Sequence, residues 1–108
     1  MPIYNKLVRD LIPEIIEADG KTCVTRILND SQYIVELNSK MHEELAEYEE
    51  ANTAEDAVEE LSDLLELIHA AAAYHGVTVD ELETVRAEKA NARGGFNERI
   101  YLVEVADD

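Results

Sequence analysis

The chain has 108 residues, of which 46% are hydrophobic, and carries 25 acidic side chains against nine basic ones. This length is typical of one domain, residues 1–108, and the apolar content excludes a disordered acidic tail. The formal net charge of −16 excludes a basic surface for binding nucleic acid.

The single cysteine, Cys23, excludes an internal disulfide and fits a reducing compartment. The first ten residues contain no apolar stretch typical of a leader peptide. No apolar run approaches the length that a membrane span requires. We therefore expect a cytoplasmic protein that binds neither membrane nor nucleic acid.

The first half of the chain predicts two helices and a strand. Residues 11–18 are predicted to form a helix with Asp10 as its N-cap. Residues 21–28 are rich in Thr, Val and Ile, which predicts a short strand. A cap at residues 29–31 then begins a long helix that is expected to reach about Ala51.

The second half of the chain contains two capping boxes, at residues 53–56 and 78–81, which predict the starts of two further helices. The first of these is expected to end near His75 and the second before Gly94. Residues 99–105 predict a second strand that pairs with the first. The predicted fold class is thus all-α, with a small two-stranded β addition.

The helix predicted after residues 29–31 has apolar side chains at helical spacing along one face. This stripe consists of Ile34, Leu37, Met41, Leu45 and Tyr48. Glu44 lies at the edge of the stripe and is not an ordinary surface acid. By the same geometry Glu43, Glu49 and Glu50 are expected to face solvent.

The next helix has its own apolar stripe, with Glu60 at the margin and Asp63 one turn later. Beyond Glu66 its sequence, LIHAAAAY, is apolar almost all round. A helix that is apolar on every side has to be covered on every side, which a lone chain of this size can hardly do. We therefore expect an oligomer in which this helix is central.

Two carboxylate pairs, Glu44 with Glu47 and Glu60 with Asp63, have i,i+3 spacing on these helices. Only a short link near residues 52–53 joins the helices, so they are expected to pack antiparallel. The two pairs lie at similar distances from that link. They are therefore predicted to face each other.

Carboxylates that converge in this way need a cation. Two like charges about 4 Å apart repel by on the order of 4 kcal/mol at an effective dielectric of ~20. No Lys or Arg occurs between Lys40 and Arg86 to relieve this repulsion. A divalent cation would do so, and oxygen-only ligands favour Mg²⁺ or Mn²⁺ over zinc. The spacing alone leaves a solvated acidic face as an equal alternative.

The order of the acids, Glu43-Glu44-x-x-Glu47 followed by Glu60-x-x-Asp63, resembles the EExxE…ExxD signature of the all-α nucleoside triphosphate pyrophosphohydrolase superfamily. Three flanking segments, YNKLVRDLIPEII, KMHEE and KANARGGFNERI, are similar to its small MazG-like, phosphoribosyl-ATP pyrophosphohydrolase-like branch. The resemblance spans nearly the whole chain.

This resemblance implies that Glu44, Glu47, Glu60 and Asp63 bind Mg²⁺, with Mn²⁺ as an alternative. Water would attack the α-phosphorus of a nucleoside triphosphate, which releases pyrophosphate and a nucleoside monophosphate. Glu44 and Glu47 are both candidate catalytic residues for taking the proton of that water. The implied fold is a four-helix, MazG-like bundle completed by oligomerisation, as a homodimer or homotetramer.

A polyanionic substrate needs basic side chains at the site of so acidic a protein. The candidates within the family-like segments are Lys6, Arg9, Lys40, Lys89 and Arg93. Lys40 has an alternative interpretation as the i,i+4 partner of Glu44. Lys89 and Arg93 have one as charges that stabilise the end of the last helix.

The sequence is interpreted as a Mg²⁺-dependent nucleotide pyrophosphohydrolase that removes non-canonical or surplus nucleotides. One alternative is the phosphoribosyl-ATP pyrophosphohydrolase of histidine biosynthesis. A second is a non-catalytic helical interaction module, in which the acids form a solvated face and the apolar helix is a docking surface.

Overall fold

The computed structural model describes residues 2–107, which contain four helices and no strand. The helices are α1 (Ile12–Ala18), α2 (Asp30–Glu50), α3 (Ala54–Tyr74) and α4 (Val79–Arg93). The all-α prediction is confirmed. None of these helices is both long and apolar enough to cross a membrane.

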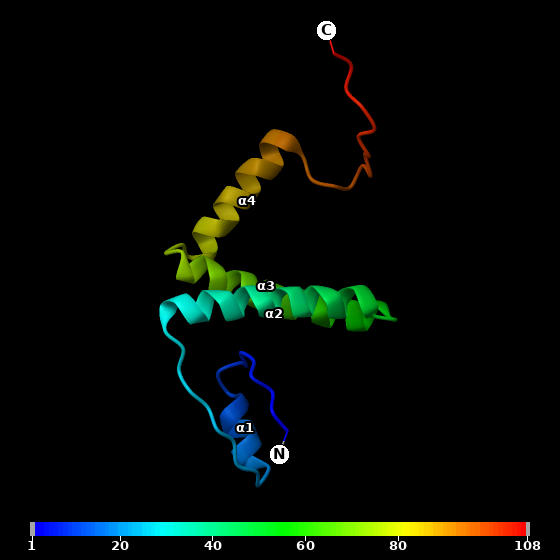
Figure 1. The fold of residues 1–108 in the computed structure, drawn as a ribbon. Helices are drawn as coiled ribbons and strands as arrows, with labels where there is room; N and C mark the ends of the chain where they lie inside the picture. Colours follow the sequence, from blue (N-terminus) through cyan, green and yellow to red (C-terminus); the bar gives the residue numbers. More distant parts are fainter. Residues whose placement is uncertain (1, 108) are drawn as a thin grey trace.

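The centre of the fold is an antiparallel hairpin of α2 and α3 (Figure 1). The rings of Tyr33 and Tyr74 meet at 6.3 Å where α2 begins and α3 ends, so the two helices run alongside each other over their length. The side chain of Leu37 is 1% exposed and is the fully buried apolar residue of this interface. This hairpin positions the acidic residues predicted to form a site.

Local capping explains where three of the helices begin. The side chain of Asn29 accepts a hydrogen bond from the N–H of Gln32 at 2.9 Å, and those of Thr53 and Thr78 cap α3 and α4 in the same way. Gly94 ends α4 with a φ of 83°, a left-handed conformation that glycine adopts without strain. These predicted boundaries are confirmed.

The prediction that Asp10 is the N-cap of α1 is wrong. Leu11, rather than Asp10, occupies the cap position, and no side chain caps the helix. Two first-turn groups need no such cap, because the N–H of Ile12 donates to the Arg9 carbonyl at 3.1 Å and Pro13 has no N–H. An Asp10 cap would have little left to satisfy.

The predicted two-stranded β addition is not present in the described chain, because residues 21–28 and 99–105 form no strand there. Figure 1 shows why these segments do not pair. The link from α1 to α2 lies on one side of the hairpin, whereas α4 and the tail leave on the other side. Two short extended segments have no stability apart from a partner.

The described chain is also much more open than a compact domain. Its radius of gyration is 18.6 Å, whereas a compact domain of this length has about 13 Å. It exposes 9747 Å² of surface, against about 6,000 Å² for a folded monomer of this mass. Apolar side chains of α3 such as Val58 and Leu65 are more than half exposed. The hairpin therefore has an apolar surface that the chain itself does not cover.

Candidate metal centre

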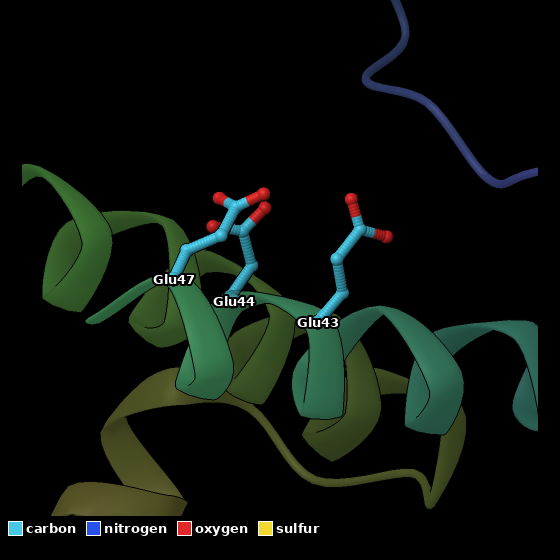
Figure 2. A group of neighbouring side chains, drawn as sticks. All are labelled: Glu43, Glu44 and Glu47. Atoms are coloured by element: carbon cyan, nitrogen blue, oxygen red, sulfur yellow. The ribbon is translucent and has the colours of Figure 1, made fainter. Parts of the chain in front are cut away.

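Three glutamates of α2 project from the same side of the helix (Figure 2). Glu43, Glu44 and Glu47 each offer a carboxylate oxygen within 4.8 Å of the others. Their i,i+3 and i,i+4 spacing on a continuous helix brings them together. Glu44 faces the α3 side of this group and Glu47 is solvent-exposed.

The neighbouring helix contributes two further acids. Glu60 and Asp63 of α3 each place a carboxylate oxygen within 4.8 Å of one from Glu44. Glu44 thus belongs to both groups and joins them. We call the five residues the carboxylate cluster: Glu43, Glu44, Glu47, Glu60 and Asp63.

Glu44 is the buried member of the cluster, with a relative exposure of 6%. Its Oε2 atom has no hydrogen-bond partner within the described residues, and neither has Oε2 of Glu60. An ionised carboxylate buried in this way is unfavourable unless a cation or a donor reaches it. These two are the buried oxygens of the cluster that lack a hydrogen-bond partner within the described residues.

The crowding of these acids raises two pKa values. Burial raises the pKa of Glu44, against a smaller lowering by a hydrogen bond with Glu60. Hydrogen bonding of its protonated form to Glu44, and then to Glu47, raises the pKa of Glu60 to about 7. Both shifts favour the protonated form of these two acids while no cation is bound.

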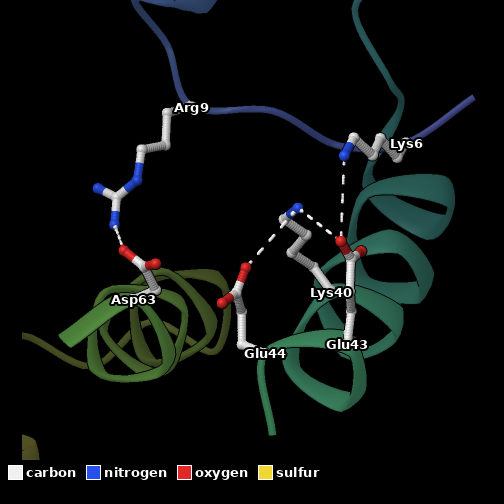
Figure 3. Close-up of polar contacts among 6 residues, drawn as sticks. All are labelled: Lys6, Arg9, Lys40, Glu43, Glu44 and Asp63. Atoms are coloured by element: carbon white, nitrogen blue, oxygen red, sulfur yellow. Dashed lines mark hydrogen bonds and ion pairs between the residues drawn. The ribbon is translucent and has the colours of Figure 1, made fainter. Parts of the chain in front are cut away.

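Three basic side chains approach the cluster from its open side (Figure 3). Lys40 Nζ lies 3.3 Å from Glu43 Oε1 and 3.8 Å from Glu44 Oε1. The segment before α1 contributes Lys6, whose Nζ lies 4.0 Å from Glu43 Oε1. It also contributes Arg9, whose Nη2 lies 2.6 Å from Asp63 Oδ1.

These basic residues do not neutralise the cluster. Five carboxylates face three cations when all the groups are ionised. The excess equals the charge of one divalent ion, and the oxygens without partners lie on the α2–α3 side. The donor set consists of carboxylate oxygens alone, which suits Mg²⁺ or Mn²⁺.

The structure thus brings seven of the nine predicted site residues together: Lys6, Arg9, Lys40, Glu44, Glu47, Glu60 and Asp63. Lys89 and Arg93 lie elsewhere, on α4, which points away from the hairpin (Figure 1). Within residues 2–107 no ion pair joins either of them to the cluster.

Sequence reasoning missed Glu43, which was expected to be an ordinary surface acid. It faces away from the apolar stripe, yet it pairs with both Lys40 and Lys6. The cluster extends beyond the α2–α3 contact toward the segment before α1, so helical angle alone misplaces this residue. Its i,i+3 spacing from Lys40 was the available signal.

The raised pKa of Glu60 predicts how the metal-free protein responds to pH. Folded Glu60 holds its proton up to about pH 7, whereas an unfolded glutamate loses it near 4.5. The folded state therefore binds more protons in this window, so the free energy of unfolding falls as pH rises through it. Urea unfolding at fixed protein concentration measures this, and Glu60→Gln should show a shallower fall. Equal slopes for the two proteins would contradict the assignment.

Comparisons with known proteins leave the family open. No family model and no solved structure matches this chain. The chain is 48% identical over 54 residues to an uncharacterized protein of Mycolicibacterium smegmatis. The match covers 50% of this chain and 55% of that protein, so the chain spans about half the length of the curated relative it matches. Because that relative is uncharacterized, it assigns no function to this chain.

Proposed function

We propose that this chain is a Mg²⁺-dependent nucleoside triphosphate pyrophosphohydrolase of the MazG-like type, acting on surplus or non-canonical nucleotides. The reaction would release pyrophosphate and a nucleoside monophosphate. One observation carries the proposal: Glu44 is buried and its Oε2 has no partner, at the point where acids from two helices converge. A solvated acidic face does not bury one of its carboxylates in this way.

The cluster fits a hydrated divalent ion. Its carboxylate oxygens lie within 4.8 Å of one another in two groups that share Glu44. Mg²⁺ keeps several waters and is commonly held by few carboxylates, so oxygens at this spacing suit a partly hydrated ion. Glu44, Glu47, Glu60 and Asp63 are the residues proposed to hold it. When bound, Mg²⁺ would offset triphosphate charge and lower the pKa of a water molecule.

The residues of the chain would supply proton transfer and positioning. Glu47 is solvent-exposed and has no ion pair within residues 2–107, so it can take a proton from the attacking water. Glu44 is buried beside Lys40, which suits a ligand better than a base. The water oxygen would bond to the α-phosphorus while the bond from that phosphorus to the bridging oxygen breaks. Pyrophosphate leaves, and the carboxylate keeps the proton.

Lys6, Arg9 and Lys40 are proposed to meet the phosphate oxygens. Each already lies against a carboxylate of the cluster, so each is near the place where a polyphosphate would lie. A divalent cation that takes over part of the charge compensation in the cluster would free these side chains for phosphate. Without them, a chain of net charge −16 would repel a triphosphate.

Substituting Arg9 by glutamine is expected to raise the KM for the triphosphate about tenfold or more, because a charged hydrogen bond to phosphate is lost. The Mg²⁺ dependence should remain, since the proposed ligands are intact. Steady-state kinetics at saturating Mg²⁺ measure the effect. Arg86→Gln removes an equal charge from α4, where Arg86 pairs with Glu83 and not with the cluster, and is the matched control. Equal KM changes in both variants would contradict the placement of Arg9.

The protein is proposed to work as a homodimer or homotetramer. The support is the exposed apolar surface of the hairpin and the open shape of the described chain. The excess area, roughly 3,700 Å² per chain over a folded monomer, is more than enough for the roughly 1,000–2,500 Å² that each partner of an obligate interface commonly buries. Lys89 and Arg93 do not lie at the carboxylate cluster of their own chain. In an oligomer they could instead lie at the cluster of a partner subunit.

Analytical ultracentrifugation of the full chain is expected to show a dimer or larger assembly at micromolar concentration. The physical reason is that apolar residues such as Leu61 and Leu65 would otherwise face water. Substituting Val58, another exposed position on α3, with aspartate should lower the assembled fraction. A monodisperse monomer across the concentration range would contradict the proposal.

The direct test is pyrophosphate release from a panel of canonical and modified nucleoside triphosphates and from phosphoribosyl-ATP, with and without Mg²⁺. Metal-dependent release from a triphosphate is the expected result. Release from phosphoribosyl-ATP alone would favour the histidine-pathway reaction. No release from any substrate by a folded oligomer would favour the non-catalytic interaction module.

A further inference from the structure

Residues 22–28 and residues 100–107 are extended segments without a backbone hydrogen-bond partner in the described chain, and Lys21, which precedes the first, donates its N–H to the Ile16 carbonyl at 3.2 Å. Their apolar side chains are among the most exposed of the molecule: Val24 is 99% exposed, Ile27 95% and Tyr101 88%. Unpaired backbone together with exposed β-branched and aromatic side chains is typical of an edge strand whose pairing partner is absent.

These segments do not reach each other within one chain. Residues 21–28 lie on the α1 side of the hairpin, and residues 100–107 extend from the far end of α4 on the opposite side (Figure 1). The chain spans 66 Å along its longest axis. A second copy, related by a twofold axis, can bring each tail to the other's segment and forms two identical contacts.

We propose that residues 100–107 of one copy pair as a β-ribbon with residues 21–28 of a second copy, in a reciprocal exchange. This goes beyond the proposed function, because it concerns the assembly and is independent of nucleotide hydrolysis. The proposed ribbon specifies which segments join two copies. The exposed apolar face of α3 indicates only that another surface covers it.

Charge favours this pairing over the other combinations of the same segments. Residues 21–28 carry Lys21 and Arg26 and no acid, whereas residues 100–107 carry Glu104 and Asp107 and no base. Pairing two tails would place acid on acid, and pairing two copies of residues 21–28 would place base on base. Only the mixed ribbon brings opposite charges together, which matters between chains of net charge −16.

One antiparallel register uses all of these charges. Placing Lys21 opposite Asp107 puts Arg26 and Glu104 on one face, as diagonal neighbours across the ribbon. The same register stacks apolar side chains on the other face, where Ile27 lies opposite Tyr101. It also places Cys23, the single cysteine of the chain, opposite Val105 of the partner.

Disulfide trapping between two distinguishable chains tests this exchange. One chain keeps Cys23, and the other carries Cys23→Ser with Val105→Cys; both are full length, differently tagged and co-expressed. Only a bond between chains can form, and it requires Cβ atoms about 4 Å apart. The expected result is a covalent heterodimer on non-reducing gels that reductant dissolves. Ala92→Cys, an exposed position on α4, replaces Val105→Cys in the control and should not crosslink.

Two further variants keep the result decisive. Val103→Cys and Tyr101→Cys detect ribbons shifted by two or four residues, so crosslinking at either one supports the exchange with a different register. No heterodimer at any tail position in a folded protein would overturn the proposal. So would a disulfide within a single chain that carries both Cys23 and Val105→Cys.

A charge swap adds a measurement without cysteine chemistry. Arg26→Glu alone and Glu104→Arg alone are each expected to weaken dimerisation about tenfold, since both ribbons lose a favourable pair and gain a like-charge one. The double variant should recover wild-type affinity in sedimentation equilibrium. Effects that simply add in the double variant would overturn the pairing. Pyrophosphate release is assayed separately, so a failure of the exchange is distinct from a failure of the proposed function.

Discussion

Substituting Glu60 by alanine is expected to abolish Mg²⁺-dependent pyrophosphate release, with a loss of at least about 100-fold in kcat/KM. Changing groups that merely orient metal ligands already costs about 10- to 100-fold, and Glu60 is itself a proposed ligand. Its Oε2 lacks a partner beside Glu44, and its pKa near 7 reflects that crowding. Activity across a Mg²⁺ titration is the measurement.

Glu59→Ala is the matched control for this experiment. Glu59 precedes Glu60 on α3, is solvent-exposed and does not belong to the carboxylate cluster. Its substitution removes the same charge from the same helix and should leave the release rate within about twofold. If both variants kept full metal-dependent activity, Glu60 would not be a ligand and the cluster would not be the active site.

Substituting Glu44 by glutamine is expected to stabilise the metal-free protein by about 1–2 kcal/mol and to remove its stabilisation by Mg²⁺. A buried carboxylate oxygen without a hydrogen-bond partner, such as Oε2 of Glu44, costs about this much, and a neutral amide of the same size can donate to neighbouring acids. In the Glu44→Gln protein Lys40 still has an ion-pair partner, because its Nζ lies 3.3 Å from Glu43 Oε1. In the wild-type protein, Mg²⁺ at 100 times its Kd adds about 2.7 kcal/mol.

Chemical unfolding of both proteins, with and without Mg²⁺ at one protein concentration, measures the two effects together. Glu49→Gln, a solvent-exposed position on the same helix, should change neither quantity by more than about 0.5 kcal/mol. A destabilised Glu44→Gln protein that still responds to Mg²⁺ would mean that Glu44 has a structural role only. The combination of higher stability and lost metal response is what a functional carboxylate predicts.

Local chemistry made the helices predictable. Asn29, Thr53 and Thr78 cap the helices they were expected to begin, because a side chain that satisfies free N–H groups acts within four residues. The position of Glu44 at the edge of an apolar stripe followed from helical geometry alone, and its carboxylate is buried in the structure. Asp10 failed as a cap because Pro13 and the carbonyl of Arg9 had already reduced the need for one.

Long-range contacts were not predictable in the same way. The two expected strands have suitable composition, yet they lie on opposite sides of the hairpin and do not pair within the chain. A strand depends on a distant partner for every backbone hydrogen bond, so composition cannot say whether that partner lies within reach. The proposed pairing between two copies would explain why both segments have the composition of strands.

The sequence by itself determined four helices, the hairpin of α2 and α3 and the acids near its turn, because capping and helical spacing act over a few residues. Only the tertiary structure decided that Glu43 joins the cluster and that Lys6 and Arg9 lie over it while α4 carries its own basic residues away. The positions of Lys6 and Arg9 depend on how the segment before α1 crosses the hairpin of α2 and α3. The ion pairs of Lys6 with Glu43 and of Arg9 with Asp63 join residues far apart in the sequence, so no local sequence rule predicts them.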